Sequence, residues 1–225
     1  MIIAIDGPSG AGKSTLAKGI AKKLGIVYVD TGALYRTIGL YVYNKGIDKS
    51  ENEKIIDCLD EIDLKLEFKN GQQSVILNGN DVGDSIRTQN IAAYASAVSA
   101  IPEVRAFLLD TQRNIAKTNS IVMDGRDIGT VIFPNADVKI FLTADDVSRA
   151  KRRFEELTLK GENTTLEKVL CEMRERDKND STRKTAPAIP ADDAIFLDNS
   201  GMELEETEAA ALGIINEKIG GISKL

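Results

Sequence analysis

Residues 7–14 read Gly7-Pro8-Ser9-Gly10-Ala11-Gly12-Lys13-Ser14, a complete G-x-x-x-x-G-K-[ST] motif that we term the phosphate loop. The apolar run at 2–5 precedes this loop and a helical pattern at 15–24 follows it. Strand, turn and helix therefore stand in the order that a nucleoside triphosphate site requires. Glycines let backbone N–H groups converge on phosphate oxygens, and the positive end of the helix dipole points at the same oxygens. Lys13 adds a mobile charge for the β and γ phosphates, so the motif predicts triphosphate binding.

The composition of the chain narrows the class of protein. A chain of 225 residues can bury a sizeable core, and we expect a single domain with insertions. No apolar stretch approaches the ~20 residues of a membrane span, and the first residues lack a signal-peptide pattern. We therefore expect a cytoplasmic protein without a membrane partner. Cys58 and Cys171 are far apart in the sequence, which favours two reduced, buried thiols over a disulfide or a zinc site.

Charge and histidine content restrict the chemistry. The net charge of −6 argues against binding to nucleic acid, which normally needs a basic face. The chain has no histidine, so catalysis has to use lysine, arginine, aspartate and hydroxyl groups. Arginines nevertheless gather in one part of the sequence: Arg149, Arg152, Arg153, Arg174, Arg176 and Arg183. This gathering indicates a small polyanionic ligand, and a solvated helix face rich in arginine is the alternative.

Short apolar runs alternate with helical patterns and predict an α/β fold, with a parallel sheet covered by helices on both faces. The runs that read as buried strands lie at 2–5, 26–29, 121–123, 138–142 and 194–197. The helix after the phosphate loop should end at Gly25, and Pro102 should open another helix. Asp145 should cap a third helix, and the acidic stretch 203–208 should open the last one.

Between residues 63 and 84 the apolar pattern changes to the period of strands. Leu64, Leu66 and Phe68 alternate with polar residues, and two Asn-Gly turns, at 70–71 and 78–79, flank a second apolar run at 75–77. This pattern predicts a small antiparallel meander inserted into the α/β frame.

Two further polar residues follow predicted strands. Asp124 comes directly after the run at 121–123, and the carboxyl ends of parallel strands face the ligand crevice, so we expect Asp124 beside the phosphate loop. There it would hold magnesium through water, as the acidic partner of the loop hydroxyl; an ordinary Asp-Gly turn is the alternative. Arg36 follows the second strand, where its guanidinium could clamp a second phosphate.

Taken together, these segments resemble the bacterial cytidylate kinases of the nucleoside monophosphate kinase family. The motifs that carry the resemblance are residues 7–15, Asp30-Thr31-Gly32-Ala33-Leu34-Tyr35-Arg36, Ile86-Arg87-Thr88, Pro102-Glu103-Val104-Arg105, Asp124-Gly125-Arg126-Asp127-Ile128-Gly129-Thr130-Val131 and Arg176-Asp177 through Arg183. The resemblance implies a P-loop kinase fold with a five-stranded parallel sheet, in one domain and as a monomer. Its core would be 1–32, 97–150 and 168–225, with a monophosphate-binding insertion at 33–96 that holds the meander and a short lid at 151–167.

The resemblance also implies the reaction. Such enzymes transfer the γ-phosphoryl group of MgATP to CMP or dCMP, giving ADP and CDP or dCDP, in pyrimidine nucleotide metabolism. The substrates would be the small-molecule partners and Mg²⁺ the cofactor. The acceptor oxygen is already an anion, so the reaction needs no general base. The lack of histidine is therefore compatible with catalysis. The obstacle is repulsion between two polyphosphates, which positioning and cationic screening overcome.

Site residues carry over by motif. The residues expected to bind ATP are Gly7, Pro8, Ser9, Gly10, Ala11, Gly12, Lys13, Ser14 and Thr15. The metal would be bound by Ser14 or Thr15, with Asp124 acting through water. Catalysis falls to Lys13, Arg126, Arg153, Arg176 and Arg183. CMP binding falls to Thr31, Tyr35, Arg36, Ser96, Arg105, Arg126, Asp127, Asp180 and Arg183.

Base choice follows from the same assignment. Asp127 and Ser96 would accept hydrogen bonds from cytosine N4, and Arg105 would donate to N3 and O2. Uracil would turn its O4 acceptor toward Asp127, at a cost of about 1–3 kcal/mol for each group left unpaired. Asp180 would accept from the sugar hydroxyls, which need not exclude the deoxy sugar.

Two other functions stay open at this point. One is a phosphate-loop kinase with another acceptor, and a hydroxyl acceptor would need a carboxylate base such as Asp124. The other is a nucleotide-dependent switch that works through a protein partner. A bare triphosphate site does not require the extra arginines Arg36, Arg126 and Arg183, which argues against a switch.

Overall fold

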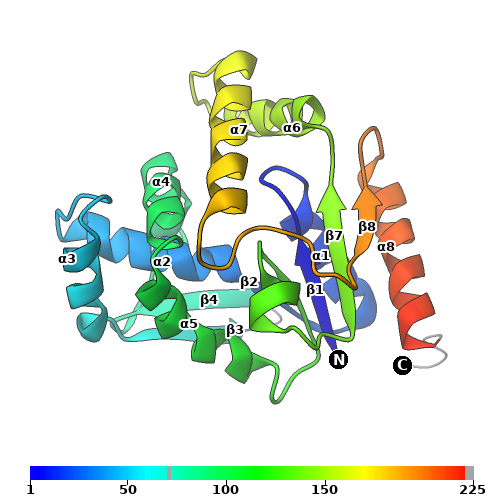
Figure 1. Cartoon of the computed structure of the whole chain (residues 1–225), viewed down its shortest axis with the longest axis horizontal. Coiled ribbons are helices and arrows are strands. Elements are labelled where there is room, and N and C mark those ends of the chain that lie inside the picture. Colours follow the sequence, from blue (N-terminus) through cyan, green and yellow to red (C-terminus); the bar gives the residue numbers. More distant parts are fainter. Residues whose placement is uncertain (70–71, 221–225) are drawn as a thin grey trace. The chain divides into compact units, whose positions relative to one another are not determined.

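The predicted apolar runs form a five-stranded sheet in this computed structural model, which describes residues 1–69 and 72–220 (Figure 1). The strands are β1 (Ile2–Asp6), β2 (Val27–Asp30), β6 (Ile121–Asp124), β7 (Val138–Thr143) and β8 (Ile195–Asp198), in the order β2-β6-β1-β7-β8. β7 pairs in parallel with β1 on one side and with β8 on the other. Ile3, Ile5 and Val122 are fully buried, as expected for a sheet covered on both faces. The predicted parallel sheet is confirmed.

The chain divides into two compact units, and each is described by itself. The first unit contains Met1–Ile26 and Val122–Leu225, and the second contains Val27–Ile121. In sequence, the predicted insertion at 33–96 falls within the second unit and the predicted lid at 151–167 within the first. The bounds of the insertion and the lid stay predictions.

Several helices of the first unit begin or end where the sequence indicated. They are α1 (Lys13–Leu24), the π-helical turn η3 (Ile128–Ile132), α6 (Asp146–Leu159), α7 (Leu166–Thr182) and α8 (Leu204–Ile219). α1 ends at Gly25, which has a φ of 64° that glycine adopts without strain. The Asp145 carboxylate caps α6 by accepting from the Ser148 N–H, and a Glu203–Glu206 capping box opens α8. α6 and α7 pack together as a helical hairpin (Figure 1).

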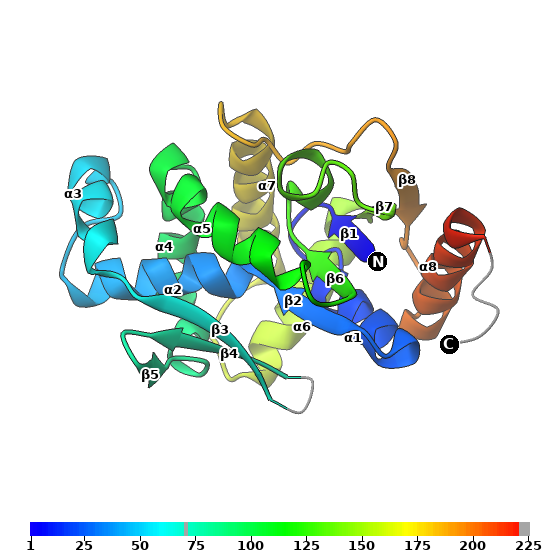
Figure 2. The same cartoon turned by 90° about the horizontal axis from the view of Figure 1, so that it is seen from below.

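The second unit packs helices around the predicted meander. Its further elements are α2 (Thr31–Asn44), α3 (Asn52–Asp57), η1 (Cys58–Glu61), β3 (Leu64–Lys69), β4 (Gln72–Leu77), β5 (Asn80–Asp81), η2 (Ser85–Arg87), α4 (Gln89–Val98) and α5 (Pro102–Ile115). β3, β4 and β5 form the antiparallel sheet (Figure 2). In its register Leu64 lies opposite Leu77. The meander is confirmed, while its predicted turn at Asn70-Gly71 lies outside the described residues. Buried Leu34 and Ile38 of α2 share one hydrophobic core with Ile91 and Val98 of α4.

Two expectations about the surface have different outcomes. Cys58 is buried, but Cys171 is exposed, so the expectation of two buried thiols was wrong for Cys171. Cys171 lies on α7, where only Val169, Met173 and Asp180 are buried, so most of that helix faces water. In residues 1–69 and 72–220 no single helix is long and apolar enough to cross a membrane. One pair, 90–98 with 102–115, reaches that length and composition only together and bends by 96°.

Candidate active site

The phosphate loop joins β1 to α1 in a backbone shape that needs glycine. Gly7 has a φ of +148°, and a Cβ there would lie 2.0 Å from the Leu142 carbonyl oxygen. Gly12 has a φ of +90° and stands at the N-cap of α1, so the helix starts where the loop ends. Lys13 is 5% exposed, and its Nζ donates to the Pro8 carbonyl oxygen at 2.6 Å. Burial, together with the nearby charge of Arg126, holds the pKa of Lys13 well below its usual value.

Asp124 lies beside the phosphate loop, as predicted from its place at the end of β6. The Ser14 hydroxyl donates to Asp124 Oδ2 at 2.8 Å, and Asp124 is 6% exposed. A hydroxyl and a carboxylate held side by side are oxygen ligands of the kind that Mg²⁺ prefers. Among the described residues no group of three or more His, Cys, Asp or Glu side chains could hold a metal ion. The chemistry of the Ser14–Asp124 pair fits a magnesium ion that takes most of its ligands from water and substrate phosphates.

Three guanidinium groups of the first unit surround one carboxylate, and we term them the arginine cluster: Arg126, Arg176 and Arg183 around Asp180. Arg126 Nε donates to Asp180 Oδ2 at 3.1 Å. Arg183 Nη1 lies 3.9 Å from Asp180 Oδ1, and Arg176 Nε lies 4.0 Å from Oδ2. Arg183 also lies near the Asp127 carboxylate, so three positive charges meet two negative ones and the cluster keeps a net positive charge for an anion.

The position of Arg176 supports that reading. Its Nε is buried and makes no hydrogen bond with the residues that the structure describes. Burial, together with the charge of Arg126, lowers the pKa of Arg176 to about 10, so the side chain stays charged at neutral pH. A buried guanidinium nitrogen without a hydrogen-bond acceptor has room in its bonding for water or an anionic ligand.

Asp127 is held in place by a residue that the sequence analysis missed. Asp127 is 3% exposed, and its Oδ1 lies 3.8 Å from Arg183 Nη2. Asp6, the last residue of β1, accepts the next two backbone N–H groups, from Ile128 at 2.8 Å and Gly129 at 2.7 Å. These bonds anchor the start of η3 directly after Asp127. The signal available in the sequence was an aspartate at the carboxyl end of a strand, immediately before Gly7.

Arg36 of the second unit points to Asp30 at the start of α2. Its Nη2 donates to Asp30 Oδ2 at 2.7 Å, while its Nε is buried without a hydrogen-bond partner in the part of the chain described. Asp30 also caps α2 by accepting from Ala33 N–H. Gln73 of the meander both accepts from the Asp30 N–H and donates to the Asp30 carbonyl oxygen. The meander therefore fixes the segment that carries Thr31 and Arg36.

Arg105 and Tyr35 meet within the second unit. The Arg105 guanidinium carbon lies 5.4 Å from the centre of the Tyr35 ring, and Arg105 is only 8% exposed. Its Nη1 donates to the Ser99 carbonyl oxygen, and the Ser99 hydroxyl donates to the Ser96 carbonyl oxygen. Ser96 is therefore linked through Ser99 to Arg105. Arg105 is therefore a buried cation and not a surface charge.

The remaining predicted residues lie as follows. Arg153 is 36% exposed and ion-pairs with Glu156 on its own helix. Thr15 is exposed on the first turn of α1, whereas Thr31 is 4% exposed at the start of α2. Two further residues escaped notice: Arg149 was counted only among the arginines, and Asp177 only within a motif, yet both contact the phosphate loop.

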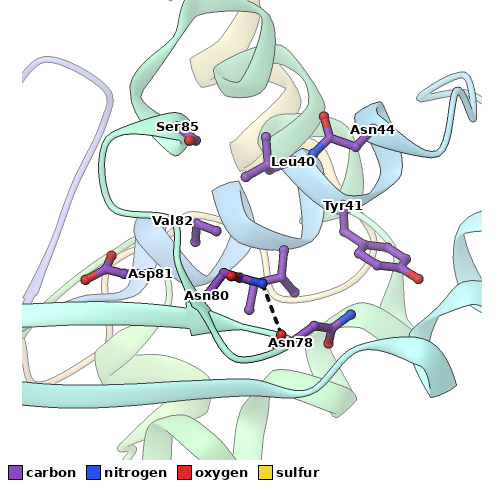
Figure 3. A pocket seen from close by; sticks show the side chains of 9 residues that line it. Leu40, Tyr41, Asn44, Asn78, Asn80, Asp81, Val82 and Ser85 are labelled. Atoms are coloured by element: carbon purple, nitrogen blue, oxygen red, sulfur yellow. Dashed lines mark hydrogen bonds between the residues drawn. The ribbon is translucent and has the colours of Figure 1, made fainter.

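A pocket of about 480 Å³ in the second unit contains none of the predicted site residues (Figure 3). Its lining is formed by Leu40, Tyr41, Asn44, Leu77, Asn78, Asn80, Asp81, Val82 and Ser85. The side-chain chemistry of a phosphate site is lacking there, since the lining has amide, hydroxyl and carboxylate groups and no cation.

Comparison with known proteins agrees with this geometry. The family model for cytidylate kinase matches residues 3–217. The cytidylate kinase of Caldicellulosiruptor saccharolyticus is 48% identical over 218 residues, which cover 97% of this chain and 96% of that protein. The cytidylate kinase of Fervidobacterium nodosum is 47% identical and covers 96% of each chain. An uncharacterized protein from Eubacterium ventriosum shares the fold, with a TM-score of 0.54 at 14% identity over 96% of this chain and 98% of that one. The phosphate loop, the arginine cluster and this full-length likeness together place the chain in the cytidylate kinase family.

Proposed function

We propose that this chain transfers the γ-phosphoryl group of ATP to CMP or dCMP, with its own arginines holding the acceptor phosphate. The observation that carries the proposal is the arginine cluster, built around Asp180 in the same unit as the phosphate loop. A protein that only binds a triphosphate has no need of a second cationic site. An enzyme that brings two polyphosphates together does, because their repulsion is the main barrier.

The first unit supplies the donor side. Backbone N–H groups of the phosphate loop and the Lys13 ammonium bind the ATP phosphates. In the structure Lys13 Nζ is held by the Pro8 carbonyl oxygen, which points the ammonium along the loop. Arg126 and Arg183 hold the acceptor phosphate, and Arg176 screens the charge that develops on the transferring group. Arg153 reaches the same group only by leaving Glu156, which its exposed position permits.

Ser14, with Asp124 acting through water, holds Mg²⁺. When bound, this ion neutralises charge on the ATP phosphates. The direct hydrogen bond between Ser14 and Asp124 supports Ser14 over Thr15 as the hydroxyl ligand. The acceptor phosphate is already an anion, so no residue of the chain has to remove a proton.

The second unit supplies CMP-binding groups. Arg36 offers the buried Nε that has no protein acceptor in the described residues, and we assign it to the CMP phosphate. Arg105 donates to N3 and O2 of cytosine and Ser96 accepts from N4, while Thr31 and Tyr35 line the same nucleotide. From the first unit, Asp127 accepts from N4.

Asp180 accepts from the sugar hydroxyls in this proposal. In the structure its carboxylate meets three arginines, so a sugar hydroxyl would join existing charge-assisted contacts. We further propose that the enzyme acts as a cytoplasmic monomer in pyrimidine nucleotide metabolism, without a nucleic-acid partner. Its proposed substrates are cytoplasmic metabolites, and the net charge of −6 disfavours nucleic acid.

Initial rates with MgATP and a panel of acceptors test the proposal. CMP and dCMP should turn over fastest, ahead of UMP, AMP, GMP and shikimate. Fastest turnover of any other acceptor overturns the assignment. Saturable binding of ATP with no saturable binding of CMP would instead point to a nucleotide-dependent switch.

A further inference from the structure

The outer side of the phosphate loop is held by two charged side chains from the α6–α7 hairpin. The Ser9 N–H donates to Asp177 Oδ1 at 2.9 Å, and the Ser9 carbonyl oxygen accepts from Arg149 Nη1 at 2.8 Å. Arg149 Nη1 also bonds Asp177 Oδ2, which closes a ring of contacts around one peptide unit. Both polar groups of the Ser9 backbone are therefore satisfied from outside the loop.

The contacts of Arg149 make this ring rigid. Its Nε donates to the Ala144 carbonyl oxygen at 3.0 Å, just beyond β7, and its side chain is 9% exposed. Gly10 lies under the same hairpin, since a Cβ there would come within 2.6 Å of Met173 Cε and 3.4 Å of Arg149 Cβ. The tip of the loop is thus enclosed by both helices, and not left open on that side.

α7 holds two aspartates that contact different parts of the candidate site. Asp177 faces the phosphate loop, and Asp180, one helical turn later, receives Arg126 at 3.1 Å. A single rigid helix therefore contacts the triphosphate loop and the arginine cluster. Along α7, the two contact points are three residues apart, roughly 4.5 Å at about 1.5 Å of rise per residue.

We propose that Arg149 and Asp177 are positioning residues that fix the phosphate loop to α7, so that ATP is held at a set distance from the arginine cluster. We term these two residues the loop clamp. The proposal rests on the proposed function in one respect, that the phosphate loop binds ATP. Phosphoryl transfer depends on near-attack geometry, so a clamp that sets this distance acts on kcat as well as on ATP affinity.

The chain offers a matched control for the loop clamp. Arg174 of α7 bonds Asp146 of α6 at 2.6 Å, so this pair also joins the two helices. The two side chains are 59% and 35% exposed, and neither bonds the phosphate loop in any contact that the structure describes. Removing the control pair weakens the hairpin without freeing Ser9.

The experiment compares Arg149→Lys, Arg149→Ala and Asp177→Asn with Arg174→Ala and Asp146→Asn. Each variant is measured for thermal unfolding, for equilibrium binding of ADP and of CMP separately, and for KM and kcat with each substrate. The clamp variants should weaken ADP binding and raise the KM for ATP by about tenfold, the worth of a charge-assisted hydrogen bond. Their kcat should fall as well, while CMP binding changes little. The control variants should shift these constants by less than about twofold.

A double variant strengthens the test. Arg149→Ala with Asp177→Asn should be no worse than the more damaged single variant, because both residues act through Ser9. Arg149→Lys keeps the positive charge, and Asp177→Asn keeps the side-chain size while removing the negative charge, so both remain informative if Arg149→Ala does not fold. Equal effects in clamp and control variants, or unchanged ADP binding in Asp177→Asn, overturn the proposal. ADP binding is independent of the acceptor, so this readout remains valid even if CMP is not the substrate.

Discussion

The pKa of Asp6 is raised by its buried surroundings. It is 5% exposed, and burial raises its pKa from 3.8 to about 6, although the N–H groups of Ile128 and Gly129 oppose the shift. The folded protein therefore binds this proton more tightly than the unfolded chain does. The resulting stabilisation is fully present below about pH 4 and is lost as the pH rises through about 6.

Asp6→Asn removes this titration, and urea unfolding of both proteins across pH measures its size. The free energy of unfolding of the wild type, minus that of Asp6→Asn, should be about 3 kcal/mol larger near about pH 4 than near about pH 7. Asp192→Asn, at an exposed carboxylate, serves as the control. Parallel pH profiles for wild type and Asp6→Asn would contradict the raised pKa.

Asp127 is the residue on which base choice depends in our proposal. Asp127→Ala should chiefly erode the preference for CMP over UMP, by about tenfold or more in the ratio of kcat/KM values, because the acceptor for cytosine N4 is lost. The measurement is kcat/KM for both nucleotides, with Asp192→Ala as the control. If Asp127→Ala keeps full discrimination, the base-recognition scheme is wrong.

At the scale of elements, local patterns were sufficient for most boundaries. Apolar runs of strand length became the five strands of the parallel sheet, and Gly25, Pro102 and Asp145 each stand at the helix end that their chemistry favours. The alternating pattern after Asp63 became the meander. These features depend on neighbours within a few residues, so the sequence predicts them well. The π-helical turn η3 was not predicted, because Asp6, 122 residues away from Ile128, helps to fix it.

Alanine substitution at two glycines, Gly7 and Gly213, should change the stability of the protein in opposite directions. Gly7→Ala should lower the stability of the fold and abolish ATP binding, because a Cβ at this φ of +148° meets the Leu142 carbonyl oxygen at 2.0 Å. Gly213 lies in α8, and a Cβ added there would meet nothing within 4 Å. Gly213→Ala should therefore raise the free energy of unfolding by about 0.5–1 kcal/mol.

Urea unfolding midpoints and equilibrium ATP binding compare the two glycine variants. The strain at Gly7 is refuted by an Ala variant that unfolds at the wild-type midpoint and binds ATP normally.

For the whole molecule, the proposed function predicts ligand-linked stability. CMP without ATP should raise the free energy of unfolding, by about 2.7 kcal/mol at a concentration one hundred times its Kd. Arg36→Ala should remove most of this gain, because Arg36 is assigned to the CMP phosphate. Lys54→Ala, at an ion pair 64% exposed on the lysine side, should leave it intact.

Thermal unfolding with and without CMP provides the measurement for all three proteins. A wild-type melting temperature that does not respond to saturating CMP contradicts a CMP site. A full response in Arg36→Ala contradicts only the role of that residue.

What the sequence alone determined is the strands of the sheet, the meander, several helix ends, the phosphate loop and the family resemblance, because each depends on residue types at short, fixed spacings. Tertiary structure decided which polar and charged groups bond one another. The Ser9 N–H donates to Asp177, which is 168 residues away in the sequence. The Gly129 N–H donates to Asp6 over 123 residues, and Arg126 donates to Asp180 over 54. No local period encodes such pairs, and burial, which only the folded chain provides, is what moves the pKa of Asp6 and of Lys13.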